Sequence, residues 1–136
     1  MCIRDSLHID SSARQTGSLS RQLGGELVAK LQAANPAATV ARRDVAQNPL
    51  PHLTESLIGA FFTPAEQRNA DQAYAIKISD ALVDELLAAD TIVIGAPMYN
   101  FSVGSSLKAW IDHVARAGRT FQYLSLIHIS EPTRPY

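Results

Sequence analysis

A turn rich in aromatic residues carries the groups best suited to holding a planar ligand, and residues 95–101 read Gly-Ala-Pro-Met-Tyr-Asn-Phe. Pro97 restricts the backbone, while Tyr99 and Phe101 offer aromatic faces. Asn100 tolerates backbone angles that leave amide groups free to face a ligand. An apolar run precedes the turn and an amphipathic segment follows it. This order predicts a ligand crevice at the carboxyl edge of a parallel sheet, with an ordinary loop after a buried strand as the alternative.

Serine hydroxyls after the first apolar run form a second group able to do chemistry: Ser12, Ser18 and Ser20. Free amides and the positive end of a helix dipole meet at such a position, which favours a phosphate. Ser18 also suits a plain helix N-cap with no ligand. Neither a GxGxxG motif nor a P-loop follows the first strand, so the pattern favours a mononucleotide over a dinucleotide or a nucleoside triphosphate.

Alternating apolar and amphipathic segments predict the α/β elements that position these groups in a parallel sheet. We expect strands at residues 7–10, 39–45 and 91–96. Arg42 and Arg43 interrupt the second strand and indicate an edge position, whereas the third is apolar throughout and is expected to be buried on both faces. Helices are expected near residues 18–34, 55–62 and 105–117, and a long helix is expected to begin at Pro64.

Local patterns also predict the ends and the buried faces of the helices. Asn35-Pro36 ends the first helix, and Gly118 suits the C-cap of the last. Apolar residues at helical spacing are expected to face the core. They are Leu19, Leu23, Leu27, Val28 and Leu31 in the first helix, Ile78, Leu82, Val83, Leu86 and Leu87 in the long helix, and Leu107, Trp110, Ile111 and Val114 in the last.

Composition narrows the functional class. The 136 residues suit one domain, and the net charge of −1 lacks the basic footprint of a nucleic-acid-binding protein. The sequence contains neither an apolar run long enough to span a membrane nor a signal peptide, so we expect a cytoplasmic protein. The single cysteine, Cys2, permits no disulfide within the chain, and the four scattered histidines have no metal-ligand spacing.

Several motifs in register resemble the FMN-dependent NADH-azoreductases, a family of flavodoxin-like quinone and azo-compound reductases. The aromatic turn is one, and Ser11-Ser12 and Ser18-Leu19-Ser20 are others. The segments 43–51, Arg-Asp-Val-Ala-Gln-Asn-Pro-Leu-Pro, and 112–121, Asp-His-Val-Ala-Arg-Ala-Gly-Arg-Thr-Phe, also match. The resemblance runs from about Leu7 to about Tyr123 and implies an α/β flavodoxin-like doubly wound parallel sheet.

The resemblance implies bound FMN, with NADH giving a hydride to flavin N5 and a quinone or azo acceptor then taking two electrons in a ping-pong sequence. No acid–base side chain is expected to be indispensable. Phe62, Phe121 and Tyr123 are candidates for the acceptor pocket, with ordinary packing or dimer contact as the alternative. The parent is expected to be a homodimer. The residues implied to bind FMN are Ser12, Ser18, Leu19, Ser20, Met98, Tyr99, Asn100 and Phe101.

Both ends depart from the family pattern, so we expect residues 7–123 to be native and residues 1–6 and 124–136 to be non-native tails. The family sheet has strand order 2-1-3-4-5, so this chain is expected to stop after strand three. It would then lack the Gly-rich loop after strand four. It would also expose an apolar edge on strand three, which favours aggregation. Two alternatives stay open: a flavodoxin-type FMN electron carrier without substrate turnover, and an inactive fragment.

Overall fold

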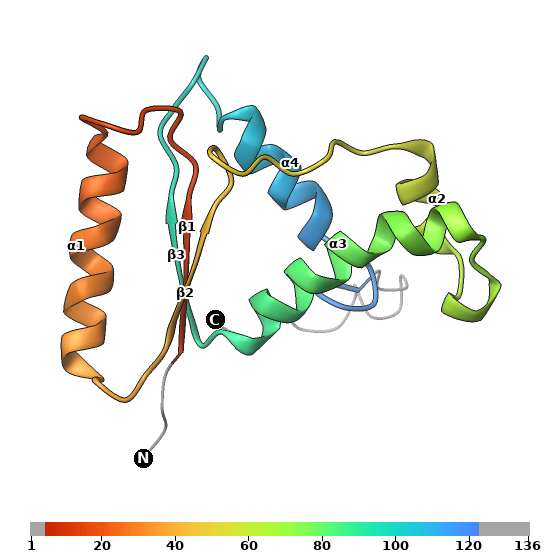
Figure 1. Ribbon diagram of the computed structural model, residues 1–136, viewed down its shortest axis with the longest axis horizontal. Helices are drawn as coiled ribbons and strands as arrows, with labels where there is room; N and C mark the ends of the chain where they lie inside the picture. Colours follow the sequence, from red (N-terminus) through yellow and green to blue (C-terminus); the bar gives the residue numbers. More distant parts are fainter. Residues whose placement is uncertain (1–4, 123–136) are drawn as a thin grey trace, which may run out of the picture.

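Three parallel strands form the centre of the computed structural model, which describes residues 5–122 (Figure 1). They are β1 (Ser6–Asp10), β2 (Val40–Asp44) and β3 (Thr91–Gly95), in the order β2-β1-β3. Ser6 of β1 pairs with Val40 on one side and with Thr91 on the other. This confirms the flavodoxin-like α/β class, and it confirms the edge position predicted for the second strand.

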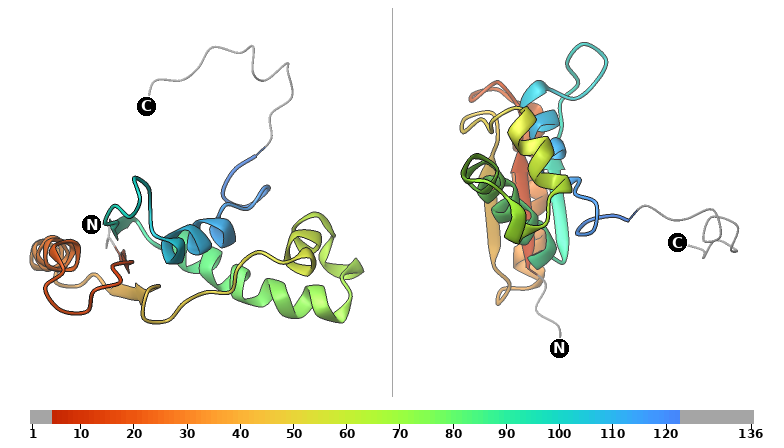
Figure 2. Two further views of the ribbon diagram at one scale, coloured as in Figure 1. Left: turned by 90° about the horizontal axis from the view of Figure 1, so that it is seen from above. Right: turned by 90° about the vertical axis from the view of Figure 1, so that its right-hand side faces the viewer.

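Helices cover both faces of the sheet. Helix α1 (Leu19–Ala34) lies on one face, and α3 (Ala70–Ala88) and α4 (Ser105–Val114) lie on the other (Figures 1 and 2). Helix α2 (Glu55–Phe62) and a short 3-10 helix, η1 (Ala65–Gln67), lie at the far end of α3. Among the residues described, no helix is both long and apolar enough to cross a membrane.

The main core lies between the sheet and the helices α3 and α4. Leu7 and Ile9 of β1 are fully buried there, because alternate side chains of a strand share one face. They pack with Leu82 and Val83 of α3 and with Trp110 of α4. The predicted core residues of the long and last helices are therefore confirmed at these positions, whereas Ile78 and Leu87 are 37% and 55% exposed.

Two predicted apolar faces are not buried. On α1 only Val28 and Gly24 are buried, while Leu19, Leu23 and Leu27 are about half exposed or more. The third strand was expected to be buried on both faces, and this is wrong, since Ile92 and Ile94 are 42% and 44% exposed. Both corrections have one cause, because β3 forms an edge of the described sheet and leaves its flank and the adjoining side of α1 uncovered.

Two predicted helix boundaries are also wrong. Pro64 precedes the 3-10 helix, and the long helix begins only at Ala70, where Asn69 and Gln72 form a reciprocal capping box. The last helix ends at Val114 rather than near Ala117. Gly118 has the positive φ typical of a C-cap glycine, but it lies in the following turn, where its amide donates to Phe121 O at 2.7 Å.

Candidate functional site

The first part of the site is the loop that joins β1 to α1. Ser18 is the N-cap of α1, and its hydroxyl accepts from the Arg21 amide at 3.3 Å. The Ser20 hydroxyl lies 3.3 Å from that of Ser18, so both groups gather at the start of the helix. The first-turn amides of a helix have no acceptor within the helix and carry its positive dipole end. Ser18 is therefore an N-cap, and the start of α1 beside it has the free amides and dipole that favour a phosphate.

Glycine is required at one point of this loop. Gly17 has φ +69°, a left-handed conformation that strains other L-residues, and a Cβ there would meet no atom within 4 Å. Ser12, at the other end of the loop, is buried, and its hydroxyl accepts from the Arg14 amide at 3.2 Å. Ser11 ties the loop to β3, because its hydroxyl donates to Gly95 O at 2.6 Å.

The second part is the aromatic turn after β3. Asn100 and Phe101 have φ of 49° and 67°. The Tyr99 amide donates to Ser102 O at 2.8 Å and the Ser102 amide donates back at 3.0 Å, which makes a tight hairpin turn with two left-handed residues. Such a conformation is strained for Phe101 and points to a functional constraint. Met98 and Phe101 are 71% and 96% exposed at its tip.

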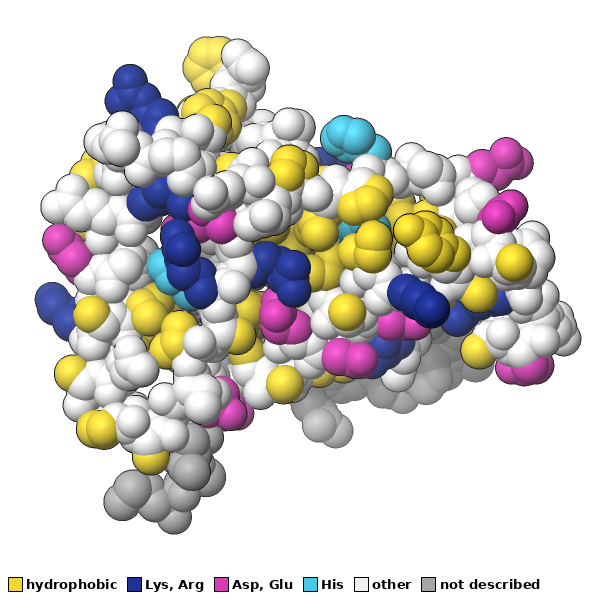
Figure 3. All heavy atoms as spheres, viewed as in Figure 1, with side chains coloured by type: hydrophobic (Ala, Val, Ile, Leu, Met, Phe, Trp, Pro, Cys, Tyr) yellow, Lys and Arg dark blue, Asp and Glu magenta, His cyan; other side chains and the backbone are white. Residues whose placement is uncertain are grey.

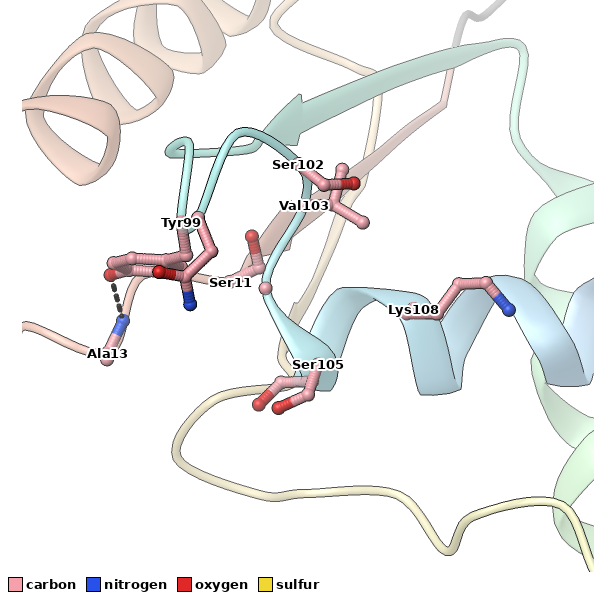
Figure 4. A pocket seen from close by; sticks show the side chains of 10 residues that line it. Ser11, Ala13, Tyr99, Ser102, Val103, Ser105 and Lys108 are labelled. Carbon is pink, nitrogen blue, oxygen red and sulfur yellow. Dashed lines mark hydrogen bonds between the residues drawn. The ribbon is translucent and has the colours of Figure 1, made fainter.

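Tyr99 joins the two parts (Figure 4). Its hydroxyl accepts from the Ala13 amide at 3.0 Å, across 86 residues of sequence. The Ala13 amide and the Ser12 hydroxyl lower the pKa of the Tyr99 phenol below its usual range, since both stabilise the charged form. The loop after β1 and the turn after β3 thus meet at the carboxyl edge of the sheet, as the sequence predicts.

Three of the eight predicted FMN-binding residues border two separate hollows. Tyr99 and Asn100 line a cavity of about 530 Å³, together with Ser11, Ala13 and residues 102–106 and 108. Ser20 lines a hollow of about 260 Å³ between α1 and β3, formed with Leu23, Leu27, Val93 and Gly95 among others. Ser12, Ser18, Leu19, Met98 and Phe101 line neither. Phe62 and Phe121 also lie outside both hollows, and Tyr123 lies outside the described residues.

A cluster of charges beneath the loop, largely buried except for the half-exposed Arg42, was not predicted from the sequence. Arg21 donates to both carboxylate oxygens of Asp44, at 2.6 and 3.1 Å, and Arg42 donates to Asp10 at 2.6 and 3.0 Å. His8 Nε2 lies 3.2 Å from the other Asp10 oxygen. The hydrogen bond from Arg21 lowers the pKa of Asp44, and the same bond raises that of Arg21. The sequence offered one sign of this cluster: Arg21 lies in the first turn of a helix, where the helix dipole disfavours a positive charge that has no partner.

A parallel sheet of order 2-1-3 with helices on both faces is typical of the flavodoxin-like class. A family model described as flavodoxin-like fold matches residues 5–135, and the chain belongs to this family. It is 57% identical over 117 residues to an FMN-dependent NADH:quinone oxidoreductase of Burkholderia thailandensis, a match covering 86% of this chain and 59% of that protein. The protein of the same description from Herminiimonas arsenicoxydans is also 57% identical, covering 86% and 57%.

Solved structures show the same likeness. The crystal structure of azoreductase AzrA superposes with a TM-score of 0.81 at 27% identity, covering 88% of this chain and 59% of that one. An azoreductase from Bacillus anthracis str. Sterne gives 0.82 at 26% identity, covering 90% and 60%. The chain thus spans about 60% of the length of the proteins that it matches.

Proposed function

We propose that this chain is part of an FMN-dependent NADH oxidoreductase that reduces quinones and azo compounds. The observation that carries the proposal is the hydrogen bond from the Ala13 amide to the Tyr99 hydroxyl. It joins the serine loop to the aromatic turn at the edge of the sheet where α/β proteins bind ligands. Identity of 57% to FMN-dependent NADH:quinone oxidoreductases supports the same function.

The residues present fit FMN in two places. The hydroxyls of Ser12, Ser18 and Ser20 and the first-turn amides of Leu19 and Ser20 offer donors to a phosphate without adding a formal charge. The exposed turn 98–101 offers aromatic and thioether surface to a planar ring. We assign the phosphate to the serines and the ring to Met98, Tyr99, Asn100 and Phe101.

Bound FMN would supply the redox chemistry, accepting a hydride from NADH and passing two electrons to the acceptor. The chain's own residues bind and orient this group. The backbone amides around Asn100 would supply fixed dipoles to the ring. We assign no side chain of the site an acid–base role; the Tyr99 hydroxyl is given the role of holding the turn to the serine loop through the Ala13 amide.

The rest of the site is proposed to come from two sources. Further strands are proposed to continue the sheet beyond β3, covering Ile92, Ile94 and the exposed leucines of α1. A second copy is proposed to complete the acceptor pocket, because hydrophobic side chains gather over the end formed by α2 and α3 (Figure 3). Phe62 and Tyr74, 73% and 75% exposed, belong to that end.

The test uses the intact reading frame that contains residues 5–122. We expect the purified protein to be yellow, to release FMN rather than FAD on heating, and to oxidise NADH steadily when a benzoquinone is present. Chromatography identifies the flavin. Recovery of FAD, or of no flavin after reconstitution, overturns the proposal. A flavin that NADH reduces once, with no turnover on quinone, supports the second candidate, a flavodoxin-type carrier. The net charge of −1 does not favour it, because such carriers are usually strongly acidic.

A further inference from the structure

Arg21 occupies an unusual position for a cation, the third residue of α1. The helix dipole disfavours positive charge in the first turn, yet the side chain is only 12% exposed and makes four hydrogen bonds. Two of them bind Asp44 at the end of β2. The other two bind the loop: Nε donates to Arg14 O at 2.7 Å and a terminal nitrogen donates to Ser12 O at 2.7 Å.

These two carbonyl contacts fix the orientation of the loop's peptide groups. In a trans peptide the C=O and the following N–H point in opposite directions. With Ser12 O turned toward Arg21, the Ala13 N–H is turned the other way, where it meets the Tyr99 hydroxyl. With Arg14 O also turned toward Arg21, the Gln15 N–H points away from the guanidinium. The hydrogen bonds from Arg21 to Ser12 O and Arg14 O therefore decide which amides of the loop point away from the guanidinium.

Asp44 anchors this arrangement to the sheet. Its carboxylate accepts from the guanidinium of Arg21 and also from the amides of Ala46 and Gln47, at 3.2 and 2.9 Å. The charge of Arg21 is thus balanced, and its donors face carbonyl and carboxylate oxygens of the protein. A lysine has a single ammonium group and cannot reproduce this planar set of bonds in two directions.

We propose that Arg21 is a positioning residue that holds the loop from Ser12 to Ser18 in the form that receives the FMN phosphate. The inference rests on the proposed function, and it assigns Arg21 no contact with the flavin. It predicts that Arg21 governs affinity mainly for the phosphate end of the ligand, since its only link to the ring side is indirect, through the Ala13 amide that contacts Tyr99.

The experiment compares FMN with riboflavin, which lacks the phosphate, in fluorescence titrations of the intact apoprotein. Two variants are used: Arg21→Lys, and the double variant Arg21→Gln/Asp44→Asn, which removes both buried charges and so spares the fold. We expect each to weaken FMN binding by about tenfold or more, as expected for lost charge-assisted bonds, while riboflavin binding changes by less than about twofold.

Arg42→Gln is the matched control, because Arg42 pairs with Asp10 and Asp44 in the same cluster but contacts no loop carbonyl. It is expected to lower the melting temperature and leave the ratio of FMN to riboflavin affinity unchanged. Three outcomes would each overturn the proposal: equal losses of affinity for FMN and riboflavin, an Arg21→Lys variant that binds FMN as tightly as the wild type, or a double variant that does not fold. A wild-type protein that binds neither flavin instead overturns the proposed function.

Discussion

Ser20 offers a way to separate ligand binding from helix capping. Its hydroxyl contacts the Ser18 hydroxyl at 3.3 Å, whereas Ser18 alone caps α1 through the Arg21 amide. Removing the Ser20 hydroxyl by Ser20→Ala deletes one hydrogen bond to a charged phosphate, a loss of about 1.5–3 kcal/mol, or roughly 10- to 150-fold in FMN affinity. Ser18→Ala loses a similar bond and also the cap, which lowers stability by about 0.5–2 kcal/mol.

The assay is a fluorescence titration of each apoprotein with FMN and with riboflavin, paired with a thermal melt without ligand. Ser20→Ala is expected to bind FMN weakly and to melt like the wild type, whereas Ser18→Ala is expected to change in both measurements. Riboflavin affinity should hold in both variants. If Ser20→Ala binds FMN as tightly as the wild type, the serines serve the helix alone and the assigned phosphate position is wrong.

Two further predictions concern the elements that support the site. Gly25→Ala in α1 should raise the free energy of unfolding by about 1 kcal/mol, because the new Cβ meets open space. Gly24→Ala should be about 1–3 kcal/mol less stable than Gly25→Ala, because its Cβ would lie 2.9 Å from His8 Nε2. Urea melts giving equal gains would contradict this packing. The lowered pKa of Asp44, due mainly to Arg21, contributes stability at neutral pH that is lost as pH falls below about 4. Asp44→Asn should therefore show a shallower acid dependence in thermal melts, and parallel curves would refute the assignment.

Local patterns predicted most of the framework. The three strands, the edge position of β2 and the span of α2 follow from hydrophobic runs and turn residues, which act over a few residues. The gathering of Ser18 and Ser20 and the left-handed Asn100 follow from local chemistry in the same way. By contrast, the start of the long helix was missed because the capping box at Asn69 competes successfully with Pro64.

Long-range partners could not be predicted from one sequence. Arg21 and Asp44 lie 23 residues apart, and Tyr99 and Ala13 lie 86 residues apart. Patterns over a few neighbouring residues therefore cannot predict either pair. The periodicity of α1 marked its leucines as a face but could not say what covers it. Only the position of β3 at the edge of the described sheet explains why that face is exposed.

The central place of β1 has a consequence for the order of folding. Its pairing with β2 closes a loop of about 34 residues and its pairing with β3 a loop of about 85, so the second closure costs about 0.5–1 kcal/mol more in chain entropy. We expect β1 and β2 to associate early and β3 to join late, with a correspondingly slower rate. The serine loop follows β1 and the aromatic turn follows β3, so the two parts of the site meet only when β3 pairs with β1. The binding site is therefore assembled at the end of folding, in the same event that seats β3 against β1.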